Sequence, residues 1–305
     1  MKKLLFVYNP FSGKGRLGRS LSDIIGTFGK AGYLVTVYST KAAHDGENFI
    51  KEHANEYDLT VAGGGDGMLH ELFSGIVSAG VTSPCGYIPS GTINDFATSL
   101  NISKVPEEAA KTAVSGVYRQ IDAGVYNGRI FSYVAAFGMF TDVGYSTDQK
   151  MKNALGPFAY YLDVLKDMDI KNFRASSVHA KLIVNGTEYE DDFIFALAGN
   201  THSVAGLTSL VPSDASMEDG LLDYAFIKTP KSLPELDRIR NALLIKNFDP
   251  AVIISGKAES LRIISDRPVR FTLDGEDGGV SSVSDISVVK HAVRIAVPAD
   301  LPDTI

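Results

Sequence analysis

The sequence predicts an α/β plus β chain, in which a helix-covered parallel sheet is followed by an antiparallel β-sandwich. Through residue 120, short apolar runs alternate with amphipathic helical segments, which is typical of a parallel sheet. Beyond residue 120, strand-like runs predominate, and Asn-Gly pairs at 127–128 and 185–186 mark tight hairpins. We therefore expect domains at 1–120 and 121–291, with the segment 292–305 able to return to the first domain.

The elements of the first domain follow from hydrophobic period. Each expected strand is a short apolar run, and each expected helix has apolar residues at helical spacing. The first run ends at Asn9-Pro10, so it is too short for the apolar region of a signal peptide. We expect strands at 3–8, 34–38, 59–61 and 85–88, and helices at 16–31, 46–55, 69–79 and 106–114.

The second domain is expected to consist mainly of strands. Two amphipathic segments, 156–166 and 232–246, are expected to be helices because each has a proline in its first turn. The expected strands are 118–125, 131–137, 179–184, 193–198, 221–227, 251–254, 261–265, 269–273 and 292–297.

Composition narrows the class of protein. The 305 residues are 45% apolar and 21% charged, as in ordinary globular proteins, and the net charge of −7 argues against nucleic acid as the main partner. A single cysteine, Cys85, excludes an internal disulfide and fits a reducing cytosol. Because no apolar stretch approaches eighteen residues, we expect any contact with lipid to be peripheral.

Two glycine-rich motifs predict a phosphate site. Val61–Gly67 and Pro89–Ala97 each follow a strand-like run, and each places a carboxylate, Asp66 or Asp95, beside bare backbone. Glycine accepts the backbone angles that aim N–H groups at phosphate, and a helix after Gly67 would point its N-terminus at the same anion. A carboxylate can face phosphate only through a cation such as Mg²⁺. The motifs together indicate a phosphotransferase, although an ordinary glycine-rich turn is the alternative for either one.

Other motifs are weaker. Gly13–Gly18 matches G-x-G-x-x-G, but the next expected strand lacks the acidic residue that would bind a dinucleotide ribose, and Arg19 replaces the lysine of a P-loop. The acidic segments 213–223 and 273–279 read alone as solvated turns. Phosphoryl transfer to a hydroxyl needs a base, however, and the first domain has no histidine clearly suited to that task. Asp274 or Glu276 could supply the base from across a cleft.

Five segments in order resemble a known family. Asn9–Lys14, Gly63–Glu71, Gly91–Ala97, Glu218–Asp223 and Leu273–Glu276 are similar to motifs of the bacterial diacylglycerol kinase family of soluble lipid kinases, related to sphingosine kinases. NAD kinases and phosphofructokinases share the Gly-Gly-Asp-Gly core, but the ordered set is more specific. The resemblance implies a nucleotide-binding α/β domain followed by a β-sandwich domain, with ATP in the cleft.

The resemblance also implies roles for individual residues. Asp274 and Glu276 would supply the acceptor base, and Asp66 and Asp95 would shape the cleft. A structural Mg²⁺ would be held by Asp219 with backbone oxygens of Ser216 and Leu221, and a second Mg²⁺ would arrive with ATP. The residues implied to line the ATP site are Asn9, Pro10, Phe11, Ser12, Gly13, Lys14, Thr40, Gly65, Asp66, Gly67, Met68, Leu69, His70, Glu71 and Thr92.

The main hypothesis is therefore transfer of the γ-phosphoryl group of ATP to a lipid hydroxyl, as in diacylglycerol. We expect a cytoplasmic protein, peripherally associated with the membrane, that could form a homodimer. Met68 stands where the family usually has threonine and cannot donate a hydrogen bond to phosphate. One alternative is therefore a non-catalytic nucleotide or lipid sensor. The other is a kinase of a soluble acceptor, such as NAD or a sugar phosphate.

Overall fold

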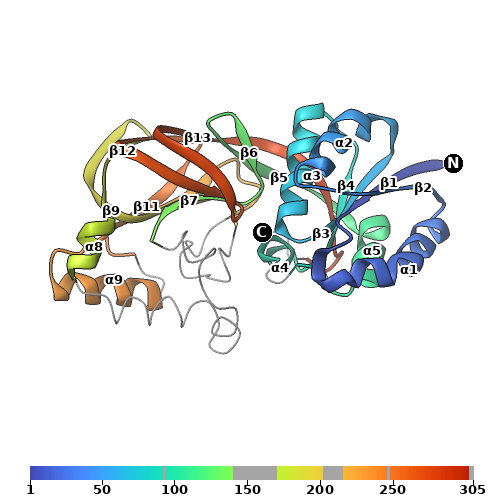
Figure 1. Ribbon diagram of the computed structural model, residues 1–305, viewed down its shortest axis with the longest axis horizontal. Coiled ribbons are helices and arrows are strands. Elements are labelled where there is room, and N and C mark those ends of the chain that lie inside the picture. Colours follow the sequence, from blue (N-terminus) through green and yellow to red (C-terminus); the bar gives the residue numbers. More distant parts are fainter. Residues whose placement is uncertain (92–93, 140–169, 202–215, 246–247, 302–305) are drawn as a thin grey trace.

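The computed structural model describes residues 1–91, 94–139, 170–201, 216–245 and 248–301 of the chain. Within these residues the strands form one 13-stranded sheet. The amino-terminal half occupies one end of an elongated molecule and the carboxyl-terminal half the other, and strand β13 runs between them (Figure 1).

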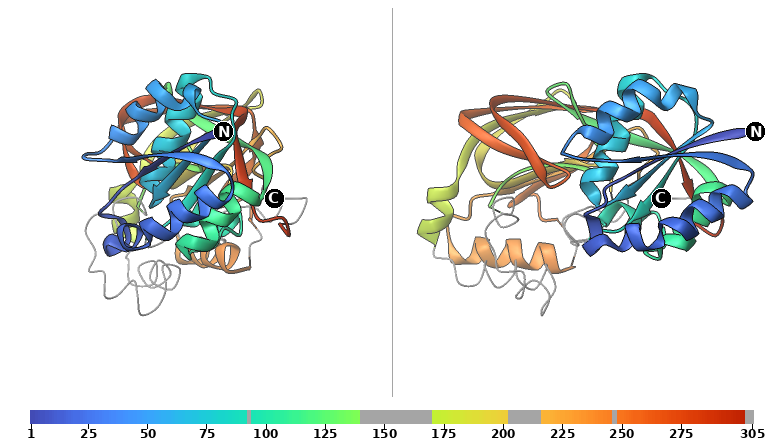
Figure 2. Two further views of the ribbon diagram at one scale, coloured as in Figure 1. Left: turned by 90° about the vertical axis from the view of Figure 1, so that its right-hand side faces the viewer. Right: turned by 45° about the vertical axis from the view of Figure 1, so that its right-hand side comes forward.

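The amino-terminal half is built on β1, which pairs in parallel with β2 and β3, while β3 pairs in parallel with β4. Every residue of β3 and β4 is buried, which explains their continuous apolar sequences. Helices α1 and α5 cover one side of this part of the sheet, and α2 and α3 cover the other (Figures 1 and 2). The bounds are β1 Lys2–Tyr8, α1 Arg16–Lys30, β2 Tyr33–Ser39, α2 Asp45–His53, β3 Leu59–Gly64, α3 Asp66–Ala79, β4 Cys85–Pro89, α4 Asp95–Ser99 and α5 Pro106–Ser115.

The carboxyl-terminal half is antiparallel. Strands β9 and β12 each pair with both β7 and β8, so these four strands close into a cycle around a second apolar core. The bounds are β5 Val117–Tyr126, β6 Arg129–Phe131, β7 Val134–Gly138, α8 Ile170–Ser176, β8 Val178–Val184, β9 Thr187–Gly199, β10 Leu222–Lys228, α9 Leu233–Ile245, β11 Ile253–Ala258, β12 Ser260–Leu273 and β13 Glu276–Val297.

Strand β13 joins the two halves. It pairs with β12 near its start and with β5 toward its end, and Ile295 lies in parallel register with Cys85 of β4. The expected strand 292–297 is thus only the last part of a 22-residue strand. The register shifts between Val289 and Val293, where His291 has a φ of 52°. This irregularity lets one strand serve both parts of the sheet.

The mixed α/β class and the antiparallel sheet are confirmed, with local differences. The expected strand 131–137 is interrupted at Ser132 and Tyr133, and the short helices α4 and α8 were not expected. The expected helix 156–166 lies outside the described residues. The two-layer sandwich and the boundary at residue 120 stay predictions. None of the described helices is long and apolar enough to cross a membrane.

Candidate active site

Three loops meet at the carboxyl ends of β1, β3 and β4. The Asn9 N–H donates to the Gly63 carbonyl at 2.9 Å, and the Ser90 N–H donates to the Gly64 carbonyl at 2.7 Å. The Ser90 hydroxyl also donates to the Ser12 hydroxyl at 2.8 Å. These bonds hold the expected nucleotide segment 9–14 against both glycine motifs, at the edge where parallel-sheet proteins bind ligands.

The glycines of these loops permit close backbone contact. A β-carbon on Gly91 would lie 2.7 Å from the Gly65 Cα, and one on Gly13 would lie 2.3 Å from the Ser90 carbonyl oxygen. Gly13 also has a φ of 59°, which favours glycine. These glycines therefore let the loops pack against one another, a role that the sequence motifs alone did not indicate.

Helix α3 begins at this meeting point, with Gly65 as its N-cap residue and no side-chain cap bond. The N-terminus of a helix is the positive end of its dipole, so this end of the 14-residue helix faces the loops. The side chains of Met68 and Leu69 are buried, and a β-carbon on Gly64 would lie 2.3 Å from the Met68 Cβ. At these two expected ATP-lining positions, therefore, it is the backbone that is suited to meet an anion.

Glu71 is occupied in positioning helix α2. Its Oε1 accepts the His44 N–H at 3.0 Å, and its Oε2 accepts the Glu47 N–H at 3.1 Å. A carboxylate at the N-terminus of α2 complements the helix dipole. Glu71 thus connects α3 to α2, and the nucleotide contact implied for it stays a prediction.

Asp66 and Asp95 begin neighbouring helices, α3 and α4. The rings of Phe73 and Phe96 pack edge to face at a centroid distance of 5.3 Å, which holds these two helices together. Asp95 is buried and Asp66 is half-buried, and the Asn94 N–H donates to Asp66 Oδ2 at 3.1 Å. The packing therefore brings the two motif carboxylates into one site.

The environment of Asp66 disfavours its charged form. Burial first, and then the charge of Asp95, raise the pKa of Asp66 to about 6. Its Oδ1 is buried and has no hydrogen-bond partner among the described residues. A carboxylate oxygen without a hydrogen-bond partner can bind a cation such as Mg²⁺ or accept a hydrogen bond from a nucleotide hydroxyl. The site therefore suits the Mg²⁺-nucleotide that the motifs imply.

Asp274 is fully buried and accepts hydrogen bonds from five donors. Oδ2 accepts the Ser132 N–H at 2.6 Å and the Ser132 hydroxyl and His70 Nδ1 at 2.8 Å each. Oδ1 accepts the N–H groups of Tyr133 and Val134 at 2.9 and 3.1 Å. Burial alone would raise the pKa of Asp274, but the bond and charge of His70 and the backbone donors lower it. Its geometry is that of an anchored anion, not of a group free to take up a proton.

The hydrogen bond from His70 joins helix α3 of the amino-terminal half to Asp274 of the carboxyl-terminal half. His70 lies on α3 with 8% of its side chain exposed; burial would lower its pKa, but the bond to Asp274 and the charge of Asp274 raise it. From the sequence, His70 was expected only as one of the residues lining the ATP site, and Ser132 was not expected to take part in the site. Neither has a local signal, because the partners lie 204 and 142 residues away along the chain.

Glu276 lies beside the first turn of α3. It is the exposed first residue of β13, and a β-carbon on Gly67 would lie 3.4 Å from its Oε1. The structure thus brings the turn 274–276 against the glycine motif, as the sequence predicted.

The remaining residues expected to line the ATP site differ in burial and in position. Thr40 is buried, and its N–H donates to the Tyr8 carbonyl at 3.0 Å, close to the segment 9–14. Phe11 is 82% exposed, and its N–H donates to Asn9 Oδ1 at 2.9 Å. Pro10 precedes the 3-10 turn Ser12–Gly15, to which Lys14 contributes backbone. Thr92 lies outside the described residues.

The turn expected to hold a structural Mg²⁺ does not fit the ion. Asp219 is the one carboxylate of the set; its Oδ1 accepts the Leu221 N–H at 3.0 Å, and its Oδ2 lies 2.8 Å from Lys257 Nζ. Mg²⁺ demands near-octahedral oxygen ligands, and an ammonium on the same carboxylate would repel it. Over the described ranges, no group of three or more His, Cys, Asp or Glu side chains could hold a metal.

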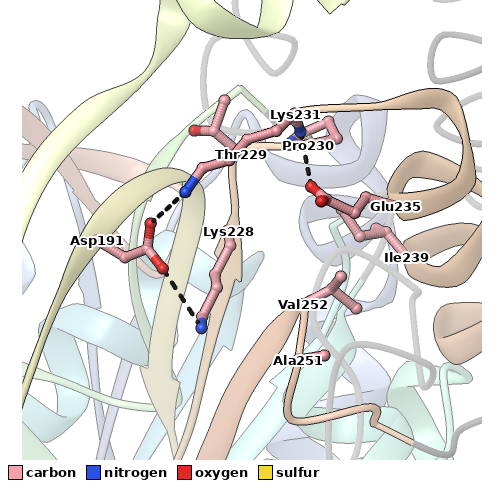
Figure 3. A pocket seen from close by; sticks show the side chains of 9 residues that line it. All are labelled: Asp191, Lys228, Thr229, Pro230, Lys231, Glu235, Ile239, Ala251 and Val252. Carbon is pink, nitrogen blue, oxygen red and sulfur yellow. Dashed lines mark hydrogen bonds and ion pairs between the residues drawn. The ribbon is translucent and has the colours of Figure 1, made fainter.

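A separate pocket lies between β9, β10 and α9, and none of the expected site residues lines it (Figure 3). Asp191 lies between Lys228 Nζ and Lys231 Nζ, at 3.4 and 3.6 Å, and the Lys231 N–H donates to Glu235 Oε2. The charges of this pocket are thus largely satisfied by one another.

Comparison with known proteins agrees with these motifs. Residues 3–126 match the family described as diacylglycerol kinase catalytic domain. The chain is 32% identical to the diacylglycerol kinase of Bacillus subtilis over 98% of both chains, and 31% identical to that of Staphylococcus carnosus over 99% of this chain and 97% of the relative. A crystal structure described as a putative diacylglycerol kinase from Bacillus anthracis superposes with a TM-score of 0.84 at 25% identity, covering 99% of this chain and 97% of the other. The chain therefore belongs to the diacylglycerol kinase family and is a lipid kinase, a phosphotransferase that acts on an alcohol group.

Proposed function

We propose that this enzyme transfers the γ-phosphoryl group of ATP to the free hydroxyl of diacylglycerol at a membrane surface. The observation that carries the proposal is the position of Glu276 beside Gly67, where the helix dipole and two glycine motifs converge. A base and a polyphosphate site are what phosphoryl transfer to an alcohol requires. In this proposal, residues 1–120 bind the nucleotide, and the β-sandwich of residues 121–291 binds the lipid.

The nucleotide would be held mainly by backbone. N–H groups of the loops and of the first turn of α3 suit the phosphates, because buried Met68 leaves the helix dipole and backbone as the donors there. Asp66 would meet Mg²⁺ through its unpartnered Oδ1, and Asp95 adds negative charge nearby. Bound Mg²⁺ would neutralise the charge that develops on the transferred group.

We assign the acceptor base to Glu276 and a positioning role to Asp274. The five bonds to Asp274 and its lowered pKa make it a poor proton acceptor, whereas Glu276 is exposed to an approaching alcohol. Glu276 would accept the proton as the hydroxyl oxygen forms its bond to the γ-phosphorus of ATP, while the bond from that phosphorus to the β,γ-bridging oxygen breaks and ADP leaves. Asp274 would keep the turn in place during this step.

The experiment is a transfer assay with labelled ATP, MgCl₂ and mixed micelles containing diacylglycerol. Wild type should form labelled lipid, whereas Glu276→Gln should bind ATP and lose turnover by at least about 100-fold. The matched control is Asp277→Asn, which removes the next carboxylate in the chain, ion-paired to Arg270 at 2.8 Å. It should retain activity.

Parallel reactions contain other lipid alcohols or NAD in place of diacylglycerol. Labelled NAD would overturn the lipid acceptor, and ATP binding without turnover on any acceptor would favour a sensor. Full activity of Glu276→Gln would show that Glu276 is not the acceptor base.

A further inference from the structure

The position of Lys257 is determined by its strand. In the antiparallel pair of β10 and β11, Lys257 lies directly opposite Asp223. The backbone of β11 is held there further by Asn185, whose Nδ2 donates to the Lys257 carbonyl at 2.8 Å. The side chain of Lys257 is 23% exposed, so it projects along a partly enclosed surface.

The ammonium of Lys257 lies between two carboxylates. Its Nζ is 2.8 Å from Asp219 Oδ2 and 4.0 Å from Asp223 Oδ1, and the side chain of Asp223 is 1% exposed. Opposite charges at this separation attract one another, and more strongly where water is partly excluded. The same ammonium thus balances an acidic turn and a buried strand carboxylate.

The turn that carries Asp219 is held independently of a metal ion. The Gly220 N–H donates to Asp122 Oδ2 at 2.7 Å, and the Leu221 N–H donates to Asp219 Oδ1. Glu218 forms a two-pronged ion pair with Arg119. These bonds use the backbone and the carboxylates of the turn, and the remaining negative charge faces Lys257.

We propose that Lys257 provides the resident cation of this turn, in place of the structural Mg²⁺ that the family resemblance implies. A tethered ammonium neutralises Asp219 without a free ion, and its strand register keeps it in place. The apo protein is therefore stable without Mg²⁺, and the enzyme's need for the ion is confined to its nucleotide.

The test measures thermal unfolding of the full chain without nucleotide or lipid, so its outcome does not depend on kinase activity. Each protein is unfolded in EDTA and in MgCl₂, with NaCl added to match ionic strength. Lys257→Met removes the charge at similar length, and Lys257→Arg keeps it. Lys181→Met is the matched control, because Lys181 is also ion-paired on a strand of the same half, to Glu188.

Wild type and Lys257→Arg should unfold at the same temperature in EDTA and in MgCl₂. Lys257→Met should unfold several degrees below Lys181→Met in EDTA and recover part of this loss in MgCl₂, because the uncovered carboxylates can then attract the ion. The proposal is overturned if MgCl₂ stabilises wild type in a saturable way that Asp219→Asn abolishes. Equal unfolding temperatures of Lys257→Met and Lys181→Met in EDTA would overturn it as well.

Discussion

His70 Nδ1 lies 2.8 Å from Asp274 Oδ2, and this bond ties helix α3 to the turn that carries Glu276. An ionised carboxylate can only accept, so the imidazole donates. The bond joins the helix at the expected phosphate site to the proposed base, two groups whose relative position decides the rate of transfer.

Replacing His70 should therefore impair catalysis more than nucleotide binding. We expect His70→Asn to lower kcat about 10- to 100-fold, with a smaller change in KM for ATP, because the α3 backbone is unaffected. Steady-state kinetics test this, with His179→Asn as control, since His179 pairs with exposed Asp192 and Glu190. Wild-type kcat in His70→Asn would contradict the coupling.

The same bond should appear in the pH dependence of stability. The folded pKa of His70 is raised, so the interaction stabilises fully below the unfolded pKa of about 6.5 and is lost as pH rises through the folded pKa. The stability difference between wild type and His70→Asn should shrink above that range. Denaturant unfolding at several pH values measures this, and a difference that grows as pH rises would contradict the sign.

Asp66 should lower stability for the sake of function. Its folded pKa of about 6 exceeds the ordinary value of 3.8, so the folded state holds its proton between these values and stability falls as pH rises through them. Above pH 6, Asp66→Asn should therefore stabilise the apo protein by up to about 3 kcal/mol and abolish turnover. Denaturant unfolding at pH 7.5 and pH 5 should show the larger gain at pH 7.5. Destabilisation by Asp66→Asn at both pH values would show that the folded state does not disfavour the charged form of Asp66.

Asp274 should behave in the opposite way. Its lowered pKa contributes stability above the unfolded value of about 3.9, and this is lost as pH falls through the folded pKa. Asp274→Asn should cost about 3 kcal/mol at pH 7, because an amide NH₂ would face the backbone donors. Asp277→Asn, at an exposed site, should change stability by less than about 0.5 kcal/mol. Chemical denaturation compares the two variants. Equal free energies of unfolding for Asp274→Asn and Asp277→Asn would show that Asp274 does not anchor the turn.

The close packing of the loops predicts contrasting glycine substitutions. Gly13→Ala should destabilise by about 1–3 kcal/mol and weaken ATP binding, because its β-carbon would collide with the Ser90 carbonyl at a positive φ. Gly18→Ala, inside α1 with open space around it, should stabilise by about 0.5–1 kcal/mol. Thermal unfolding and calorimetry with ATP separate the two, and similar effects of both substitutions would contradict this packing.

Local pattern predicted the first half of the chain well, because buried parallel strands are continuous apolar runs and their helices are amphipathic. It failed for most of β13, where serine, glycine and charged residues separate the valine and isoleucine residues of 276–291 and weaken the strand signal. The pairing with β12 and β5 overrides that weak propensity.

The site was predictable in its motifs but not in the division of labour within them. Asp274 and Glu276 are equally acidic in sequence. What distinguishes them is that Asp274 is buried and accepts bonds from His70 and from the N–H groups of Ser132, Tyr133 and Val134, whereas Glu276 is exposed. Those N–H groups are available because the strand expected at 131–137 breaks there. Likewise, nothing near Lys257 in sequence indicates its pairing with Asp219, which depends on the register of β10 and β11.

The long strand β13 also constrains how the protein comes apart. Because it borders β12 at one end and β4 at the other, loosening either half removes backbone partners from a segment that the other half needs. Amide protons of β13 should therefore exchange only when the whole chain opens, and heating should melt both halves in one cooperative transition.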